Sequence, residues 1–399
     1  MDFKNYLVPG KTGLLIGIGG VSMSPLAEVL HDAGLDIRGS DMAESSNTLT
    51  LRERGIPIHI GHSADNVTDD ISFVIRTAAV HDDNPEVHEA HRRGIPVFER
   101  TQAWGALMRG YQNALCISGT HGKTTTTSMC THIMMAAEKD PTVMIGGTLP
   151  LLKACHRVGK GNTIIMESCE YYNSFLALNP TIAVVLNIEA DHLDFFKDLE
   201  DIKHSFRCFA ERVPVETGTV IANYDDANTM DALRGIARKV ITFGLNAKAD
   251  VYAQNIVHRG SVSEFDIYHR GNYFARVTLH VPGIHNVRNA LAATAAAIVL
   301  GVSPNAVKYG LAGFEGAGRR FDFKGKFQGA DLYDDYAHHP SELRALLDAV
   351  DTLNYQRTIV VFQPHTYSRT AKLFNDFVEQ LRRPTIVYLA EIYACLLYT

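Results

Sequence analysis

The sequence predicts an α/β protein of three domains, each built around a largely parallel sheet. The chain has 399 residues, which at about 150 residues per domain is enough for two or three hydrophobic cores. Short apolar runs typical of buried strands alternate with helix-like segments along most of the sequence. Glycine-rich turns separate a strand from a helix at residues 17–20 and again at residues 119–122. We place the boundaries near residues 105 and 317, which gives domains of residues 1–105, 106–317 and 318–399.

The composition is typical of a globular protein rather than a membrane or nucleic-acid-binding protein. Hydrophobic residues make up 46% and charged residues 21% of the chain, and no apolar run approaches the ~20 residues that cross a bilayer. Residues 1–6 lack the basic region and apolar core of a secretory leader. The net charge of −6 argues against a nucleic-acid surface, and the six cysteines form no C-x-x-C pair. We therefore expect a cytoplasmic protein with reduced thiols, no nucleic-acid partner and no membrane insertion.

The first segment predicts a β-α-β unit, the Rossmann-like start of a nucleotide-binding domain. A strand at residues 13–16 is followed by a helix to Gly34 and a second strand that ends at Asp41. Glycines in the first turn would place a phosphate at a helix N-terminus, and Asp41 could bind a ribose or a base. Ser22 stands where a dinucleotide fingerprint has its last glycine, which favours a single nucleotide diphosphate; a purely structural turn is the alternative. The candidate residues are Gly17, Gly19, Gly20, Ser22, Ser24 and Asp41.

Further β/α alternation completes this first domain. Residues 73–77 and 95–98 are predicted strands, and residues 85–93 are a predicted helix. Residues 101–111 carry the only tryptophan and lead into the second domain.

The second domain opens with a predicted strand, phosphate loop and helix. An apolar run ends at Ser118, a Gly-Thr-His-Gly turn follows, and Lys123 opens a segment with helical periodicity. Such a loop directs backbone N–H groups at a polyphosphate, Lys123 can reach its β- and γ-phosphates, and a Thr hydroxyl can bind Mg²⁺. It is a shortened G-x-x-G-K-T loop, and the simpler reading is a helix that begins after a glycine. The predicted ATP-binding residues are Gly119, Thr120, His121, Gly122, Lys123, Thr124 and Thr125.

Polar clusters follow the next two predicted strands. Residues 163–167 lead to Glu167 and Glu170, and the strand beginning at Thr181 leads to the cluster at residues 187–194. Ligands bind at the carboxyl ends of strands in open α/β sheets, so both clusters should face the phosphate loop. Carboxylates and phosphate oxygens are the ligands that Mg²⁺ prefers, and this predicts a magnesium site; solvated surface groups are the alternative.

The remaining predicted elements are an alanine-rich helix and a third β/α unit. His285, Asn286 and Asn289 begin the helix that runs to residue 300, where they can hydrogen-bond to a base or simply cap the helix. The predicted strands beyond it are residues 330–333, 358–362 and 385–389, with helices that end at residues 353 and 381.

Seven motifs, in order along nearly the whole chain, resemble those of the Mur ligase family, which builds the peptide stem of bacterial cell-wall precursors. They are Gly-Ile-Gly-Gly-Val-Ser-Met-Ser, Gly-Thr-His-Gly-Lys-Thr-Thr-Thr, Asn-Ile-Glu-Ala-Asp-His-Leu-Asp, His-Asn-Val-Arg-Asn-Ala, Gly-Arg-Arg-Phe-Asp, Asp-Asp-Tyr-Ala-His-His-Pro and Gln-Pro-His-Thr-Tyr-Ser-Arg-Thr. The resemblance implies that the first domain holds UDP-N-acetylmuramate, the second uses ATP and Mg²⁺, and the third admits L-alanine. The implied reaction transfers the γ-phosphoryl group to the muramate carboxylate, and the alanine amine then displaces phosphate.

The same resemblance assigns roles to individual residues. Thr124 and Glu170 would hold a first Mg²⁺ and His192 a second. The adenosine side would be lined by His285, Asn286, Asn289 and Arg320, while Tyr336, His338 and Arg369 would face the amino acid or the phosphates. The implied catalytic residues are Lys123, His192, Tyr336, His338 and Arg369.

Three departures from the family pattern refine these expectations. The stretch Glu167-Ser-Cys-Glu170 is less rich in aspartate than is usual. Sister ligases carry a modified lysine where Phe206 falls here, with Lys203 one turn earlier, and this favours the alanine-adding member. After Ala394 the sequence leaves the pattern, so we expect a truncated third domain, with Leu396, Leu397 and Tyr398 uncovered and weak ligation. A tripeptide-adding ligase and a non-catalytic nucleotide-binding protein are the alternatives.

Overall fold

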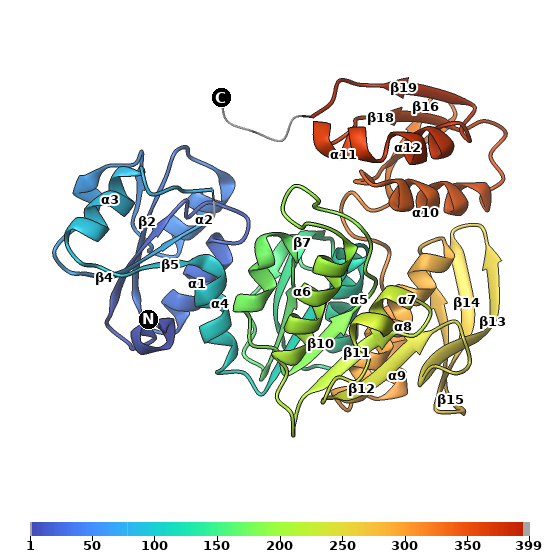
Figure 1. Cartoon of the computed structure of the whole chain (residues 1–399), viewed down its shortest axis with the longest axis horizontal. Helices are drawn as coiled ribbons and strands as arrows, with labels where there is room; N and C mark the ends of the chain where they lie inside the picture. Colours follow the sequence, from blue (N-terminus) through green and yellow to red (C-terminus); the bar gives the residue numbers. More distant parts are fainter. Residues whose placement is uncertain (1, 78, 394–399) are drawn as a thin grey trace.

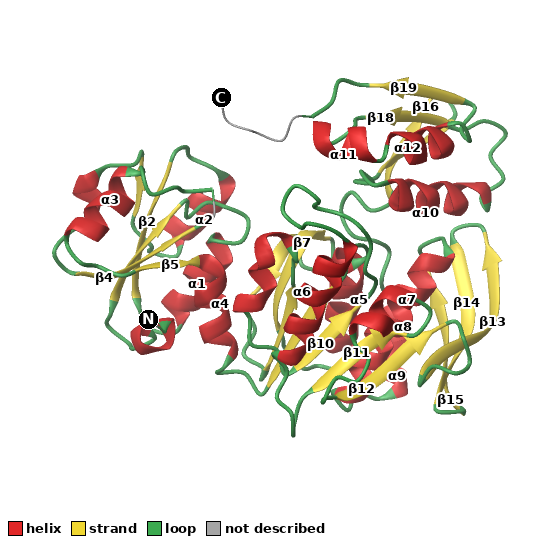
Figure 2. Ribbon diagram, viewed as in Figure 1, coloured by secondary structure: helices red, strands yellow, loops and turns green. Residues whose placement is uncertain are grey.

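The computed structural model describes residues 2–77 and 79–393. The chain forms an N-terminal domain with strands β1–β5, a central domain with strands β6–β15 and a C-terminal domain with strands β16–β19 (Figure 1). Helices pack on parallel sheets in the first two of these (Figure 2), and the predicted α/β fold class is confirmed. The expectation for Leu396, Leu397 and Tyr398 lies outside the described residues. No helix in the described ranges combines the length and hydropathy of a membrane span.

The N-terminal domain is a fully parallel five-stranded sheet in the order β3-β2-β1-β4-β5. Its central strand is buried along its whole length because helices cover both faces, and this explains the continuous apolar run in the sequence. The strands are β1 (Thr12–Ile16), β2 (Asp36–Asp41), β3 (Ile58–Ile60), β4 (Ile71–Arg76) and β5 (Val97–Glu99). The helices are η1 (Phe3–Tyr6), α1 (Ser24–Asp32), α2 (Ser46–Glu53), η2 (Ala64–Asn66), α3 (Pro85–Arg92) and α4 (Arg100–Met108).

The central domain is a ten-stranded sheet in the order β15-β14-β13-β12-β11-β10-β6-β9-β7-β8. Strand β6, which carries the phosphate loop, lies between β10 and β9 and is parallel to both. The strands are β6 (Asn113–Ser118), β7 (Thr142–Leu149), β8 (Ala154–Arg157), β9 (Thr163–Glu167), β10 (Ile182–Val185), β11 (Thr219–Asn223), β12 (Lys239–Gly244), β13 (Val251–Arg259), β14 (Val262–His269) and β15 (Asn272–Leu279). The helices are α5 (Lys123–Ala136), η3 (Tyr171–Ala177), α6 (Leu199–Glu211), α7 (Ala227–Ala232), α8 (Ile284–Val299) and α9 (Pro304–Ala312).

Antiparallel pairs at both edges of this sheet were not predicted from the sequence. Strands β13, β14 and β15 form a meander, and β8 pairs with β7. In the interior, α5 packs with the alanine-rich α8, whose small side chains are almost all fully buried. This explains the alanine run as close helix packing.

The C-terminal domain has two separate two-stranded sheets and a small core. Strands β16 (Asp322–Phe327) and β17 (Ala330–Asp334) form an antiparallel hairpin, and β18 (Ile359–Phe362) pairs in parallel with β19 (Ile386–Leu389). The sequence did not predict β16, and the expected helix ending at residue 381 divides at Leu373, which leaves the helical region with ψ 22°. The helices are α10 (Pro340–Asp351), α11 (Tyr367–Lys372) and α12 (Phe374–Leu381).

A buried ion pair joins the N-terminal domain to the central domain. Nε2 of His156 on β8 lies 3.2 Å from Oε1 of Glu28 on α1, and the two side chains are 17% and 7% exposed. Burial alone lowers the pKa of His156, but the contacts with Cys155 and Glu28 outweigh burial and raise the pKa to about 9. The imidazole is therefore charged at neutral pH.

We expect this pair to stabilise the protein in a pH-dependent way. A folded-state pKa above the unfolded value of about 6.5 gives a contribution that is complete below that pH and is lost as the pH rises through about 9. His156→Gln should lower the free energy of unfolding by on the order of 1–2 kcal/mol at pH 6 and by much less at pH 10. Urea unfolding at both pH values measures the difference, with the exposed His59→Gln as the control. A loss of equal size at both pH values would contradict the assignment.

Candidate active site

The phosphate loop is a tight turn held between the end of β10 and the start of α8. Gly119 and Gly122 have φ of +144° and +83°, so a side chain at either would be strained. A Cβ at Gly122 would also lie 2.6 Å from Oδ1 of Asn289. Asn187 secures the loop because its Oδ1 accepts the His121 N–H at 2.8 Å and its backbone oxygen accepts the Thr120 N–H at 3.0 Å. The loop is thus preformed by contacts outside itself.

Lys123 is folded back over this loop and paired with an acidic residue. Its Nζ lies 2.5 Å from the Gly119 oxygen and 3.0 Å from Oε2 of Glu170, whose residue is 2% exposed. Burial by itself lowers the pKa of Lys123, but the charge and hydrogen bond of Glu170, together with the charges of Cys169 and Glu167, outweigh burial and raise the pKa above its usual range. The ammonium group therefore stays charged at the position where a phosphate would meet the loop.

The carboxylates after β9 and the histidine after β10 meet beside Lys123. Thr124 Oγ1 donates to Oε1 of Glu167 at 3.0 Å, and Nε2 of His192 lies 3.9 Å from Oε1 of Glu170. The two clusters meet because β9 and β10 flank β6 in the sheet. Thr124 and Glu170 were expected to bind the same Mg²⁺. In the structure Thr124 is hydrogen-bonded to Glu167, whereas Glu170 is paired with Lys123.

These residues suit a hard divalent cation. The site offers two carboxylates, a hydroxyl and one imidazole at the carboxyl edge of a parallel sheet, and the oxygens match what Mg²⁺ prefers. Lys123, the nearest cation, already offsets part of the carboxylate charge.

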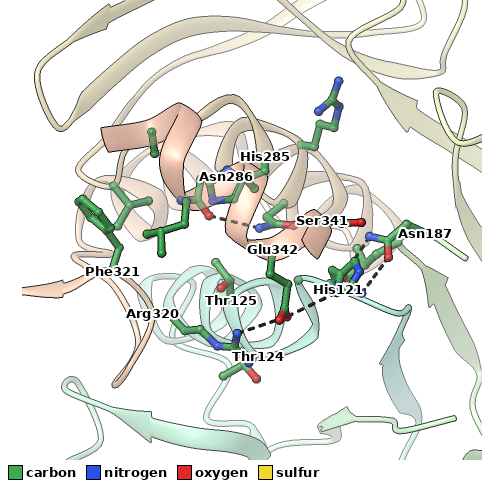
Figure 3. A pocket seen from close by; sticks show the side chains of 18 of the residues that line it. His121, Thr124, Thr125, Asn187, His285, Asn286, Arg320, Phe321, Ser341 and Glu342 are labelled. Atoms are coloured by element: carbon green, nitrogen blue, oxygen red, sulfur yellow. Dashed lines mark hydrogen bonds and ion pairs between the residues drawn. The ribbon is translucent and has the colours of Figure 1, made fainter. Parts of the chain in front are cut away.

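A cavity of about 330 Å³ opens next to the loop, between the central and C-terminal domains. Figure 3 shows side chains from α5, α8 and α10 that surround it. All four residues expected on the adenosine side line it together with the loop: His285, Asn286, Asn289 and Arg320. Burial lowers the pKa of His285 to about 4, so its ring is neutral and can both donate and accept hydrogen bonds.

The C-terminal domain closes this cavity through the start of α10. Oε1 of Glu342 lies 3.4 Å from Nδ1 of His121 and 3.7 Å from a guanidinium nitrogen of Arg320 (Figure 3). Ser341 Oγ donates to a carboxylate oxygen of Glu189. These contacts bring the phosphate loop, the loop after β10 and α10 together.

Two predicted residues of the C-terminal domain lie outside the cavity. Tyr336 is 41% exposed, and its ring packs 4.7 Å from the Arg319 guanidinium. Nδ1 of His338 lies 2.9 Å from the backbone oxygen of Tyr336. Neither side chain lines the cavity among the described residues. The His338 ring instead lies 5.6 Å from that of His365.

Arg369 connects the C-terminal domain to the loop after β10 that carries His192. Its Nη2 lies 2.9 Å from Oδ1 of Asp191, and both side chains are 9% exposed. Burial alone raises the pKa of Asp191, but the charges of His192 and Arg369 outweigh it and lower the pKa to about 2. Arg369 therefore reaches the loop after β10 rather than the cavity.

The N-terminal glycine turn is held by Asp41. Its Oδ2 accepts the Gly19 N–H at 2.8 Å, and Asn47 donates to the Gly19 oxygen at 2.8 Å. Gly17 has φ +76° and Ser24 begins α1, so all the predicted residues of this turn lie together after β1. In this structure Asp41 shapes the turn itself.

Sequence reasoning missed Arg100 at the N-terminal turn. Arg100, at the start of α4, donates to Ser22 Oγ in the N-terminal turn, although 78 residues separate the two. No local motif marks Arg100. Asn187, by contrast, belongs to the polar cluster at residues 187–194 that was expected to face the phosphate loop, and its contacts with Thr120 and His121 place it there.

The residue that was expected at the position of the modified lysine of sister ligases lies in the core. Phe206 on α6 is fully buried, and its ring lies 5.3 Å from that of Phe175. Lys203 is paired on the surface with Glu200 at 2.7 Å and Asp231 at 3.2 Å. Phe206 has no polar group to offer the residues around Lys123, and the Lys203 ammonium is held by Glu200 and Asp231 instead.

The fold and the site together define a nucleotide-binding protein of the phosphate-loop α/β class. Sequence profiles of three domains match in order: the Mur ligase family catalytic domain at residues 15–112, the Mur ligase middle domain at 117–297 and the Mur ligase glutamate ligase domain at 319–392. The chain belongs to the Mur ligase family.

Individual relatives agree with this assignment. A UDP-N-acetylmuramate–L-alanine ligase of Agathobacter rectalis is 46% identical over 380 residues, which are 95% of this chain and 83% of the relative. The crystal structure of the UDP-N-acetylmuramate-alanine ligase from Thermotoga maritima superposes with a TM-score of 0.79 at 31% identity, covering 96% of this chain and 85% of that one. The UDP-N-acetylmuramate:L-alanyl-γ-D-glutamyl-meso-diaminopimelate ligase from Neisseria meningitides has a TM-score of 0.69 at 26% identity, covering 77% and 99%.

Proposed function

We propose that this protein is an ATP-dependent ligase that joins L-alanine to the carboxylate of UDP-N-acetylmuramate in cytoplasmic peptidoglycan precursor synthesis. The observation that carries the proposal is the arrangement around the phosphate loop. A charged Lys123, a carboxylate cluster and a base-sized cavity meet where the C-terminal domain touches the central domain. The alanine ligases among the relatives, at up to 46% identity, support the choice of substrates.

In this proposal the central domain binds ATP. The loop N–H groups and Lys123 hold the phosphates, and the neutral His285 with Asn286 and Asn289 holds the adenosine in the cavity. The substrate carboxylate takes the γ-phosphoryl group, and the alanine amine then attacks the acyl phosphate and releases phosphate. Lys123 lowers the barrier by offsetting charge between two polyanions that otherwise repel each other.

The N-terminal domain, which we assign to residues 1–105, would hold the UDP end of the sugar nucleotide. The glycine turn at Gly17, Gly19 and Gly20 leads directly into α1, and Arg100 adds a partly buried positive charge next to Ser22. Residues 106–317 and 318–399 are the central and C-terminal domains of the proposal. We assign Tyr336, His338 and Arg369 to the closing face that admits the amino acid.

Thr124 and Glu170 would hold one Mg²⁺ and His192 a second, with Glu167 as a neighbouring carboxylate. When bound, the cation supplies positive charge that neutralises the transferring phosphoryl group. Lys123 must exchange its contact with Glu170 for the phosphates when ATP enters.

Glu170→Gln and His192→Ala should each raise the Mg²⁺ concentration needed for half-maximal rate by about tenfold or more, since each removes a ligand or its orienting neighbour. Phosphate release measured over a Mg²⁺ titration gives this value. Asp194→Asn is the matched control, because the Asp194 carboxylate accepts the Tyr171 hydroxyl at 2.5 Å instead. An unchanged Mg²⁺ dependence in both variants would remove these residues from the metal site.

The function is tested by supplying candidate amines to the full chain with ATP, Mg²⁺ and UDP-N-acetylmuramate. We expect phosphate release with L-alanine and none with L-alanyl-γ-D-glutamyl-meso-diaminopimelate. Release with the tripeptide alone would instead support the tripeptide-adding ligase, whose fold is also similar. Nucleotide binding without release in either mixture would support a non-catalytic nucleotide-binding protein.

A further inference from the structure

Three metal-binding side chains from distant parts of the sequence meet beside the phosphate loop. They are His121 of the loop, Glu189 after β10 and His339 at the N-cap of α10, and one ligand atom from each lies within 4.8 Å of the others. Nε2 of His121 is 3.4 Å from Oε2 of Glu189, and Nδ1 of His339 is 4.0 Å from the same oxygen. The cluster thus spans the boundary between the central and C-terminal domains.

Two buried ring nitrogens in this cluster lack a hydrogen bond within the described part of the chain. Nε2 of His121 and Nε2 of His339 are both buried and make no hydrogen bond to the described residues. His339 as a whole is only 5% exposed, and the two rings lie 4.9 Å apart. Buried polar atoms are normally hydrogen-bonded, so Nε2 of His121, which faces the Glu189 carboxylate at 3.4 Å without a hydrogen bond, is available to bind a cation together with that carboxylate.

The surroundings hold His121 and Glu189 in a ligating orientation. Nδ1 of His121 lies 3.4 Å from Oε1 of Glu342 (Figure 3). The Glu342 carboxylate can therefore accept a hydrogen bond from Nδ1–H, which leaves Nε2 as the nitrogen that faces Glu189. This carboxylate–histidine arrangement is the usual support of a metal-bound imidazole. Ser341 Oγ donates to Glu189 and orients its carboxylate, while Nδ1 of His339 has only a long 3.3 Å contact with the Ser341 N–H.

We propose that His121, Glu189 and His339 form a Zn²⁺ site that links the phosphate loop to α10, separate from the Mg²⁺ site at Glu170. Two imidazoles and one carboxylate are a common Zn²⁺ ligand set, with a water in the fourth position, whereas Mg²⁺ prefers oxygen ligands. Ligand atoms of a tetrahedral zinc lie about 3.3 Å apart, so the His121 and Glu189 atoms are already spaced correctly. The His339 ring must approach by on the order of 1 Å, which displaces its weak contact with Ser341.

The test measures metal binding to the full chain without nucleotide, so it is independent of the proposed ligase activity. Calorimetric titration with zinc chloride in millimolar Mg²⁺ should show one Zn²⁺ per chain. His339→Ala and Glu189→Gln should each weaken this binding at least tenfold, while His339→Cys, which restores a zinc ligand, should bind more tightly than His339→Ala. The exposed His59→Ala is the matched control and should leave the affinity unchanged.

A second measurement on the unaltered chain covers the case of a variant that fails to fold. Co²⁺ added in place of Zn²⁺ should give the intense visible absorption of a four-coordinate site, and Zn²⁺ should abolish it. The proposal is overturned if Co²⁺ shows only the weak spectrum of the hydrated ion, if folded His339→Ala and Glu189→Gln bind Zn²⁺ as tightly as the unaltered chain, or if His59→Ala removes the binding.

Discussion

Lys123→Ala should reduce phosphate release by at least 10³-fold while leaving the binding of UDP-N-acetylmuramate nearly unchanged. The Lys123 ammonium contacts the phosphate loop backbone, with Nζ 2.5 Å from the Gly119 oxygen. Positive charge aimed at a transferring phosphoryl group acts mainly in the transition state, and its removal lowers the rate more than ground-state binding. The proposed sugar-nucleotide site after β1 lies in another domain, on a separate sheet. Activity assays and calorimetry with each ligand measure the two effects.

Lys139→Ala is the matched control, because Lys139 is an exposed lysine shortly after the same helix. It should leave both the rate and the binding unchanged. Lys123→Ala could also lose activity through instability, because it leaves the buried Glu170 carboxylate without its partner. The double variant Lys123→Ala, Glu170→Gln removes that unpaired charge and should recover stability but no activity. Loss of both ligands in Lys123→Ala, with the fold intact, would show that the division between the two sites is wrong.

Arg369→Ala should lower kcat by about 10²-fold, since small misplacements of a closing domain have effects of this size. The Arg369–Asp191 pair joins the C-terminal domain to the loop that carries His192, and both side chains are almost buried. Removing one member of a buried pair leaves the other charge uncompensated, which costs on the order of 3–5 kcal/mol. Arg369→Lys keeps the charge but cannot form the two contacts that Nε and Nη2 make with Asp191, and should recover only part of the rate.

A double-mutant cycle with Asp191→Asn separates the ion pair from other roles of Arg369. If the pair acts as a unit, the double variant should lose no more activity than Arg369→Ala alone. Arg344→Ala on the exposed side of α10 is the matched control and should retain full activity. Unchanged kcat in Arg369→Ala would show that this contact does not position the C-terminal domain for turnover.

Local sequence patterns were sufficient for the phosphate loop and for most elements around it. The apolar run before Gly119, the glycines and the helical periodicity after Lys123 predicted β6, the loop and α5, because strand, turn and helix each depend on neighbours in sequence. The glycine turn after β1 was predicted for the same reason. The extra strands β13–β15 and strand β16 were missed because their pairing is antiparallel and lies outside the β/α alternation that guided the prediction, whereas β17 was predicted as the strand at residues 330–333.

Only the tertiary structure decided which of these residues meet. The sequence by itself determined the α/β class, the order of the domains and the candidate residues at strand ends, since these follow from short-range periodicity and turn chemistry. The sheet order β10-β6-β9 then brought Glu170 next to both Lys123 and His192, and gave Thr124 a different partner, Glu167. Arg100 beside Ser22, Arg369 on Asp191 and His339 beside His121 are each contacts across more than 70 residues. Such contacts arise from the packing of sheets and domains against one another, and no local pattern in the chain records them.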